Sequence, residues 1–355
     1  MRQAIKLIYV EPLFTISVFV LIALGLLVLN SIAPQIFPIY YFYIIVSIGI
    51  FILFSRINFK TISAFAWHFY ILSILFLIIP LIIGQITRGS IRWIPLGPIT
   101  IQPSELVRPF LLIFFAVYVN VKEVSLRHLF NIALLALIPL VLILIQPSLG
   151  VSVITLLGVM GIVLFSKINK RLLISLILII LITIPLSWVI LAPYQRQRVF
   201  SFINPFTDPK GSGYNSIQAM IAVGSGKIFG RGLGKGVQTQ LAFLPERHTD
   251  FIFASVSEEL GSIGAVVVVL GLFIILWRIT VFIETANDET ARGYLIGVFF
   301  VLLAECIIHI GMNMGLLPIT GIPLPLVSAG GSALLATSIS LAIAISASGL
   351  LNTLS

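Results

Sequence analysis

Charged residues are scarce in this sequence of 355 residues, since Asp, Glu, Lys and Arg make up only 9% of it, against about 25% in an ordinary soluble protein. Such a chain has too little polar surface to cover soluble globular domains, so that class is excluded. Intrinsic disorder is excluded as well, because the sequence holds 26 Phe and is 59% apolar. The single cysteine, Cys306, excludes an intramolecular disulfide framework and a cysteine-based metal cage. These absences predict a membrane protein.

Long apolar runs are what the sequence has instead. A helix needs about 20 mostly apolar residues to cross the bilayer core. Ten segments meet this requirement approximately, at residues 13–33, 38–55, 64–83, 106–119, 129–146, 149–166, 172–192, 251–277, 293–314 and 332–350. The first is too long for a signal peptide and another span follows it at once, so we expect it to be retained. The sequence therefore predicts one all-α polytopic domain of ten transmembrane helices over residues 1–355.

The basic residues predict the orientation of these helices. Eleven of the 21 Lys and Arg lie before the first span or in alternate short loops on the same side, namely Arg2, Lys6, Arg56, Lys60, Lys122, Arg127, Lys167, Lys170, Arg171, Arg278 and Arg292. The opposite short loops, at 34–37, after Gln146 and at 315–331, hold none. Because positive charge is retained on the cytoplasmic side, both termini are predicted to be cytoplasmic.

The other ten basic residues lie on the predicted outer side, before the fourth span and in the long loop 193–250 between the seventh and eighth spans. Loops of this length are usually functional, although a solvated loop near lipid headgroups is the alternative. Six glycines between Gly224 and Gly236 suit either a backbone cradle for an anion or a packed irregular loop.

Asp250 is the strongest catalytic candidate, because it ends the cation-rich loop and opens the eighth span. If the helix includes it, Asp250 and Glu258 share one helix face. The alternative is a helix cap, a role that Thr249 can take instead. Glu305, His309 and Asn313 recur every four residues on the ninth span, where hydrogen bonds between helices are the expected role.

Two further outer segments have unusual composition. Arg92 stands beside Trp93, a pair suited to a phosphate and an amphipathic ligand, whereas Pro103 and Glu105 suit the start of a helix. The uncharged segment 317–332 is rich in Pro and Gly, so we expect it to re-enter the membrane against protein or to line a cavity. No pair of histidines has the spacing of metal ligands, so no protein metal site is predicted.

These segments together resemble the RodA/FtsW (SEDS) family of bacterial peptidoglycan polymerases over essentially the whole chain. The resemblance rests on Arg92-Trp93, Gln102-Pro-Ser-Glu105, Gln146-Pro-Ser-Leu-Gly150, the loop 194–250, Phe251-Ile-Phe-Ala254, Glu258-Glu-Leu-Gly261 and Pro323-Leu-Pro-Leu-Val-Ser328. Arg247 within Pro245-Glu-Arg-His-Thr-Asp250, and Gly321-Ile-Pro-Leu-Pro325, resemble the elongation branch, RodA, more than the division branch, FtsW. Two positions depart from the family pattern: Ser148 replaces an acid, and Arg108 replaces a common Lys.

The resemblance implies a glycosyltransferase that polymerises lipid II on the outer face of the bacterial cytoplasmic membrane, for cell elongation and shape. It implies Asp250 as general base, with cations that offset the charge of the leaving pyrophosphate. The candidate substrate-binding residues are Arg92, Trp93, Glu105, Arg108, Arg196, Arg198, Lys210, Arg247, His248, Glu258 and Ser328. A divalent cation, Mg²⁺ or Mn²⁺, between phosphates is a candidate cofactor. The expected partners are the growing glycan strand, a class B penicillin-binding protein acting as transpeptidase and other elongation-machinery membrane proteins, with no nucleic acid.

Three alternatives stand beside this prediction: a lipid II flippase, a division polymerase of the FtsW type, and a scaffold without activity. A continuous path of charged residues to both membrane faces would favour the flippase. The cations and glycines instead lie on the predicted outer side, which favours the polymerase.

Overall fold

The computed structural model describes residues 11–83, 91–175, 178, 193–209, 211 and 213–350. Within them almost all of the regular secondary structure is helical. The elements are α2 (Pro12–Ile32), η1 (Pro34–Ile36), α3 (Ile39–Arg56), α4 (Phe59–Ala64), α5 (Ala66–Ile83), β1 (Ile94–Leu96), β2 (Ile99–Ile101), α6 (Pro103–Leu106), α7 (Arg108–Asn120), α8 (Leu126–Ile145), α9 (Leu149–Leu164), α11 (Pro193–Ile203), η2 (Pro205–Thr207), α12 (Tyr214–Ser225), α13 (Val237–Gln240), α14 (Ile252–Thr285), α15 (Glu289–Asn313) and α16 (Gly331–Ala347).

The boundaries of several helices follow directly from the sequence. Pro12 occupies the first turn of α2, where no backbone N–H is needed. Ser125 caps α8 by accepting a hydrogen bond from the N–H of His128 at 3.3 Å, and Asp288 caps α15 in the same way through Ala291. A cap fixes where each apolar run becomes a helix.

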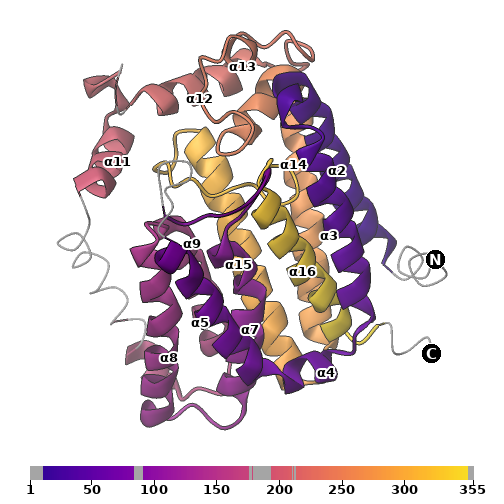
Figure 1. The fold of residues 1–355 in the computed structure, drawn as a ribbon, viewed down its shortest axis with the longest axis vertical. Helices are drawn as coiled ribbons and strands as arrows, with labels where there is room; N and C mark the ends of the chain where they lie inside the picture. The colour runs from indigo at the N-terminus through magenta and orange to yellow at the C-terminus, as the bar shows by residue number, and fades with distance from the viewer. Residues whose placement is uncertain are drawn as a thin grey trace.

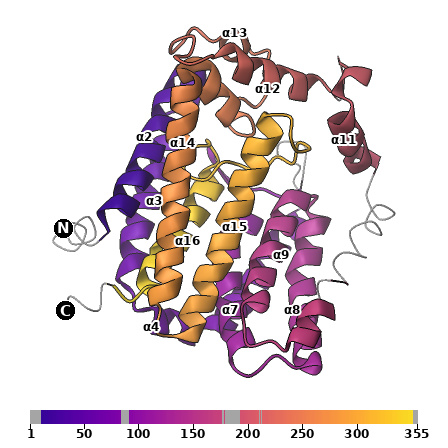
Figure 2. The ribbon, with the colours of Figure 1, turned by 180° about the vertical axis from the view of Figure 1, so that it is seen from behind.

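The long helices run side by side as a bundle, and α15 lies among α7, α9, α14 and α16 (Figures 1 and 2). The short helices α11, α12 and α13 gather at one end of this bundle, which we call the loop end, whereas α4 lies at the other end. The polar residues of the outer segments are thereby brought to the loop end.

In the part of the chain that the structure describes, seven helices are long and apolar enough to cross a membrane. In α15, 67% of the most apolar window is buried, but in α3, α5 and α8 only 22–28% is buried, so these peripheral helices expose apolar side chains. Exposed apolar surface of this extent requires lipid as the solvent. The chain is an all-α polytopic membrane protein with at least seven membrane-length helices.

The predicted spans at 13–33, 38–55, 64–83, 106–119, 129–146, 251–277 and 293–314 correspond to these seven helices. Those at 149–166 and 332–350 correspond to shorter apolar helices, α9 and α16. The prediction at 172–192 falls mostly outside the described residues.

The hairpin of β1 and β2 was not predicted from the sequence. Ile94 pairs with Ile101 and Leu96 with Ile99, and the turn between them places Gly97 at φ +65°. Three-residue strands are too short for alternation of apolar and polar residues to reveal them. The hairpin matters because it connects Arg92 and Trp93, which precede β1, to α6, which follows β2.

Candidate active site

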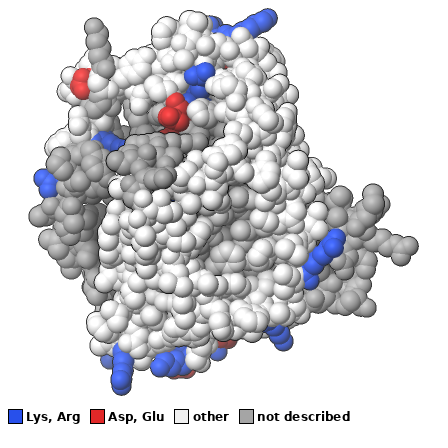
Figure 3. Space-filling view, in the orientation of Figure 1, with Lys and Arg blue, Asp and Glu red and all other residues white. Residues whose placement is uncertain are grey.

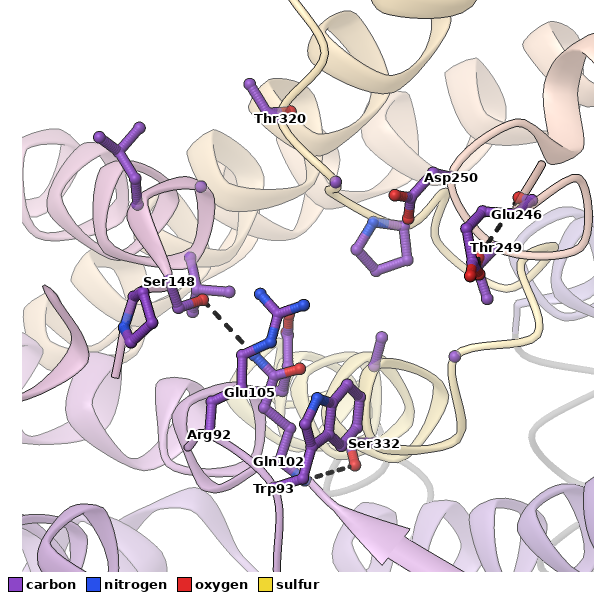
Figure 4. A pocket seen from close by; sticks show the side chains of 18 of the residues that line it. Arg92, Trp93, Gln102, Glu105, Ser148, Glu246, Thr249, Asp250, Thr320 and Ser332 are labelled. Carbon is purple, nitrogen blue, oxygen red and sulfur yellow. Dashed lines mark hydrogen bonds between the residues drawn. The ribbon is translucent and has the colours of Figure 1, made fainter. Parts of the chain in front are cut away.

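A cavity of about 440 Å³ lies at the loop end of the bundle, where Arg198 of α11 is among its lining residues. Its walls come from six parts of the sequence: Tyr43 of α3, the residues around the hairpin, the start of α9, α11, the turn before α14 and the segment 318–333. Figure 4 shows Arg92 and Trp93 reaching into it from one side, with Asp250, Glu246 and Thr249 on the other. The segment 317–332 thus lines a cavity, as its composition predicted.

Asp250 lies in a tight turn and not within α14, which begins at Ile252. The N–H groups of Thr249 and Phe251 both donate to the carbonyl oxygen of Glu246, at 3.1 and 3.2 Å, and Thr249 Oγ1 donates to Glu246 Oε2 at 2.9 Å. The turn places the Asp250 side chain at the cavity wall.

Asn313 holds this turn from the neighbouring helix α15. Its Nδ2 donates to the carbonyl oxygens of Asp250, at 3.1 Å, and His309, at 2.8 Å, while its Oδ1 accepts from the N–H of Ala254 at 3.0 Å. The Asn313 side chain is fully buried, so its amide is held by all three backbone groups at once. Because the helix start has no side-chain cap of its own, Asn313 fixes both the first turn of α14 and the Asp250 backbone.

The electrostatic setting of Asp250 favours proton acceptance. Burial and, to a smaller extent, the negative charge of Glu246 raise the pKa of its carboxyl, the positive charges of Arg92 and Arg198 lower it, and the net pKa is about 6. Within the described residues no donor forms a hydrogen bond to the carboxylate oxygens. A carboxylate with this pKa is ionised at neutral pH and is a stronger base than an ordinary Asp.

The segment 317–330 lies beside Asp250 and is hydrogen-bonded to the turn that carries it. Ser328 Oγ donates to the carbonyl oxygen of Thr249 at 3.0 Å, and the N–H of Ala329 donates to that of His248 at 2.9 Å. Gly321 has φ +72°, and a Cβ there would lie 3.4 Å from Asp250 Oδ2. A side chain at this position would be strained and would crowd the carboxylate.

The predicted cations divide into two groups. Arg92 and Arg198 line the cavity, and Arg198 Nη1 donates to the carbonyl oxygen of Ile319 at 3.4 Å. Arg196, on the same helix α11, is not among the lining residues. Lys210 lies outside the described residues.

Glu105 lines the cavity, but Arg108 lies behind it. Arg108 Nη2 is 3.0 Å from Glu105 Oε2 and 2.6 Å from Glu305 Oε1, and its side chain is only 3% exposed. Arg108 is therefore placed to join α15 to the cavity wall, where it contacts two carboxylates.

Four other predicted binding residues lie outside the cavity lining: Ser328, whose contact with Thr249 is described above, and Glu258, Arg247 and His248. Glu258 is fully buried, and its two oxygens accept from the N–H groups of Gln238 and Thr239 at 2.9 and 3.0 Å. Arg247 donates from Nε and Nη2 to the carbonyl oxygen of Ile32, at 3.2 and 3.1 Å. His248 Nε2 lies 4.0 Å from Glu246 Oε2. The structure thus separates Glu258 from Asp250.

Among the described residues, the glycine-rich run donates a single backbone N–H to a carboxylate, and that carboxylate belongs to the protein itself. The N–H of Gly234 donates to Glu259 Oε1 at 3.1 Å, and Ser31 Oγ and Gln240 Nε2 donate to the same oxygen at 2.9 Å each. The second expectation for this run, a packed irregular loop, describes it best.

Several cavity residues were not singled out from the sequence as site residues. Gln102 has its N–H bonded to Ser332 Oγ at 2.9 Å and its Nε2 within 3.5 Å of Ser148 Oγ (Figure 4). Tyr43 and Thr100 exchange hydrogen bonds at the hairpin, and Glu246 adds a third acid to Glu105 and Asp250. Uncharged polar residues cannot be recognised as cavity residues from the sequence, because their partners are far away in the chain. Glu246 could have been recognised, because it lies four residues before Asp250 in Pro245-Glu-Arg-His-Thr-Asp250.

The fold and the site together define a polytopic membrane protein with a polar, acid- and arginine-lined cavity at one end of its bundle. The model of the FtsW/RodA/SpoVE family, described as cell cycle proteins, matches residues 5–352. This chain belongs to that family.

Individual relatives agree with this assignment. The chain is 38% identical to the peptidoglycan glycosyltransferase MrdB of Escherichia coli K12 over 291 residues, 81% of this chain and 78% of MrdB. It is 36% identical to the probable peptidoglycan glycosyltransferase FtsW of Nitrosomonas europaea, over 94% of this chain and 91% of that protein.

Solved structures show the same fold. RodA of Thermus thermophilus matches with a TM-score of 0.70 and 26% identity, over 94% of this chain and 95% of RodA. A chain in a peptidoglycan synthase complex, from work on the coordination of polymerization and crosslinking, matches with a TM-score of 0.78 and 28% identity, over 94% and 95%.

Proposed function

We propose that this peptidoglycan glycosyltransferase polymerises lipid II at the cavity of the loop end, with Asp250 as the general base. The observation that carries the proposal is the Asp250 carboxylate itself. It faces the cavity, its pKa is raised to about 6, and the arginines Arg92 and Arg198 act on it electrostatically.

Glycosyl transfer from a lipid-linked donor needs these groups. Asp250 accepts the proton of the acceptor sugar hydroxyl while the oxygen of that hydroxyl forms a bond to the anomeric carbon of the donor, and the bond from that carbon to the pyrophosphate oxygen breaks. Pyrophosphate is a weak base, so cations and not a carboxylic acid assist its departure. Arg92 and Arg198 are placed to offset its charge, and Trp93 to pack on the apolar part of the ligand.

A divalent cation does not follow from the protein's own donors. The described residues hold no group of three or more His, Cys, Asp or Glu side chains suited to a metal ion. Mg²⁺ or Mn²⁺ therefore enters the proposal only as a counter-ion of the substrate phosphates, and no step depends on it.

We place the cavity on the outer face of the bacterial cytoplasmic membrane, with ten spans and both termini cytoplasmic. The seven membrane-length helices together with α9, α16 and the apolar run 172–192 supply ten spans. The eleven basic residues of alternate short loops support the orientation.

The proposed partners are a class B penicillin-binding protein that crosslinks the strands, and other membrane proteins of the elongation machinery. Support comes from the likeness to a chain of a peptidoglycan synthase complex. A division role of the FtsW type remains the second candidate, because the FtsW relative is nearly as similar as MrdB.

The deciding experiment is polymerisation of purified lipid II by the reconstituted protein, with and without divalent ions, comparing the native chain with Asp250→Asn. We expect glycan strands from the native chain alone. The proposal would be abandoned if correctly folded Asp250→Asn polymerised at the native rate. Movement of lipid II across sealed vesicles without glycan growth would support a flippase instead.

A further inference from the structure

The segment 227–235 at the loop end, Lys-Ile-Phe-Gly-Arg-Gly-Leu-Gly-Lys, has no part in the site described above, yet the fold holds it in a fixed position. The N–H of Arg231 donates to the carbonyl oxygen of Glu258 at 2.9 Å, and that of Gly232 donates to Glu259 at 3.0 Å. The N–H of Ser262 donates to the carbonyl oxygen of Lys227 at 2.8 Å. A Cβ on Gly230 would lie 2.1 Å from the carbonyl oxygen of Glu259, so only glycine allows this contact.

These contacts place the segment at the level of the membrane surface. Helix α14 is broken at Gly261, where φ is +69°, and the part after the break runs to Thr285. That part is about 36 Å long at 1.5 Å per residue, enough for a hydrocarbon core of about 30 Å. Helix α2 ends at the same level, because Ser31 in its last turn accepts from the N–H of Gly234 at 2.7 Å.

Three apolar side chains of the segment are exposed at this level: Ile228 by 61%, Phe229 by 80% and Leu233 by 43%. They adjoin the lipid-facing side of α14, since the N–H of Ile263 donates to the carbonyl oxygen of Ile228 at 3.3 Å. Exposed residues continue along that helix at intervals of three and four, namely Ile263, Val266, Leu270 and Phe273. The apolar surface of the segment therefore continues a surface that faces lipid.

Three cations alternate with these apolar residues. Lys227, Arg231 and Lys235 are all exposed, and none of them lies within 4 Å of a carboxylate in the part of the chain that the structure describes. Figure 3 shows basic side chains projecting at the loop end. Apolar and aromatic side chains flanked by Lys and Arg are typical of protein surfaces that lie in the headgroup region.

We propose that residues 227–235 form a membrane-interface anchor, in which Ile228, Phe229 and Leu233 enter the bilayer and Lys227, Arg231 and Lys235 bind the phosphates of anionic phospholipids. Backbone hydrogen bonds connect this anchor to α14, and Asp250 lies two residues before the start of that helix. The anchor thus sets the depth of the active-site turn relative to the membrane surface. This inference is independent of the glycosyl transfer proposed above.

A spin label at Phe229→Cys, in a Cys306→Ala background reconstituted into phosphatidylglycerol-containing vesicles, tests the insertion. The expected result is high accessibility to oxygen and low accessibility to a water-soluble nickel chelate, as for a label at the lipid-facing Phe273→Cys. Free access of the nickel chelate to the label would overturn the proposal. It would indicate that the segment is instead a surface for a protein partner, because no such partner is present in the vesicles. If Cys306→Ala does not fold, labelling with Cys306 retained gives the same readout, because that residue is buried.

The second arm tests the cations. The Lys227→Gln, Arg231→Gln, Lys235→Gln variant carries the same label, and vesicles of phosphatidylcholine with and without phosphatidylglycerol are compared. We expect phosphatidylglycerol to raise the ratio of oxygen to nickel accessibility several-fold in the native segment but not in the variant. An equal response of both would overturn the headgroup contact.

Discussion

Asp250 and Glu258 are two carboxylates eight residues apart that the fold uses in opposite ways. Glu258 is fully buried, and both of its oxygens accept backbone N–H groups of the loop that packs on α14. Asp250 is partly exposed, and within the described residues its oxygens accept no hydrogen bond. A carboxylate whose acceptor sites are filled stabilises structure, whereas one held near cations with its acceptor sites open is available for chemistry.

The largest effect is expected from a substitution of Asp250, the carboxylate with open acceptor sites. Asp250→Asn removes the proposed base and should lower the polymerisation rate by about 10²-fold or more. It should leave the melting temperature unchanged or raise it. The raised pKa of Asp250 means that its stabilising contribution is present below the ordinary value of 3.8 and is lost as the pH rises through about 6. At neutral pH the ionised carboxylate therefore lowers the free energy of unfolding, and Asn removes this destabilisation.

Glu258→Gln is the matched control for that variant. It removes the charge-assisted acceptor of two buried N–H groups and should cost about 1–3 kcal/mol of unfolding free energy, with polymerisation retained at low temperature. Thermal unfolding in detergent beside strand synthesis gives both readouts. Equal loss of activity in both variants would contradict the division of roles.

A second expected effect concerns Arg108, the cation between Glu105 and Glu305. Arg108→Met leaves two buried carboxylates without their cation, which should destabilise the protein by about 3–5 kcal/mol. Arg108→Lys keeps the charge but not the planar donors, so its loss should be smaller. Thermal unfolding measures both variants, and a native melting temperature for Arg108→Met would show that the ion pairs do not hold α15 to the cavity wall.

Asn313→Leu tests whether Asp250 depends on the side chain that holds its backbone. It removes the amide that holds Asp250 and Ala254, so kcat should fall by as much as ~10²-fold through misplacement of the base, with KM little changed. Asn120→Leu is the control, because the Asn120 side chain donates, among the described residues, only to the carbonyl oxygen of Ala116 on its own helix. A raised KM with native kcat would assign Asn313 to substrate binding and not to positioning.

The smallest expected effect is a shift in the pH profile. Because the pKa of Asp250 is about 6, the rate should rise as the pH passes through that value and then reach a plateau. Glu246→Gln removes a negative neighbour and should move the midpoint to lower pH, whereas Arg198→Gln removes a positive one and should move it to higher pH. Midpoints that move in the same direction would exclude Asp250 as the titrating group.

The sequence indicates several side chains of the cavity wall better than it indicates the contacts among them. Arg92, Glu105, Arg198 and Asp250 are conspicuous as charged residues in an apolar chain, Trp93 stands beside one of them, and all five line the cavity. Arg108 and Glu258 were named for the same reason, but the structure places them away from the cavity lining. Conspicuous charge does not reveal whether a side chain faces a ligand or a partner within the protein.

The apolar runs by themselves determined that the chain crosses a membrane and where most of its helices lie, since only regular helices satisfy the backbone in lipid. The distribution of Lys and Arg set the predicted orientation. Tertiary structure alone decided which polar groups meet. The break at Gly261 separates the first turns of α14 from its membrane-crossing part, and the amide of Asn313 fixes the turn that carries Asp250. Such contacts join residues far apart in the chain, and no local pattern encodes them.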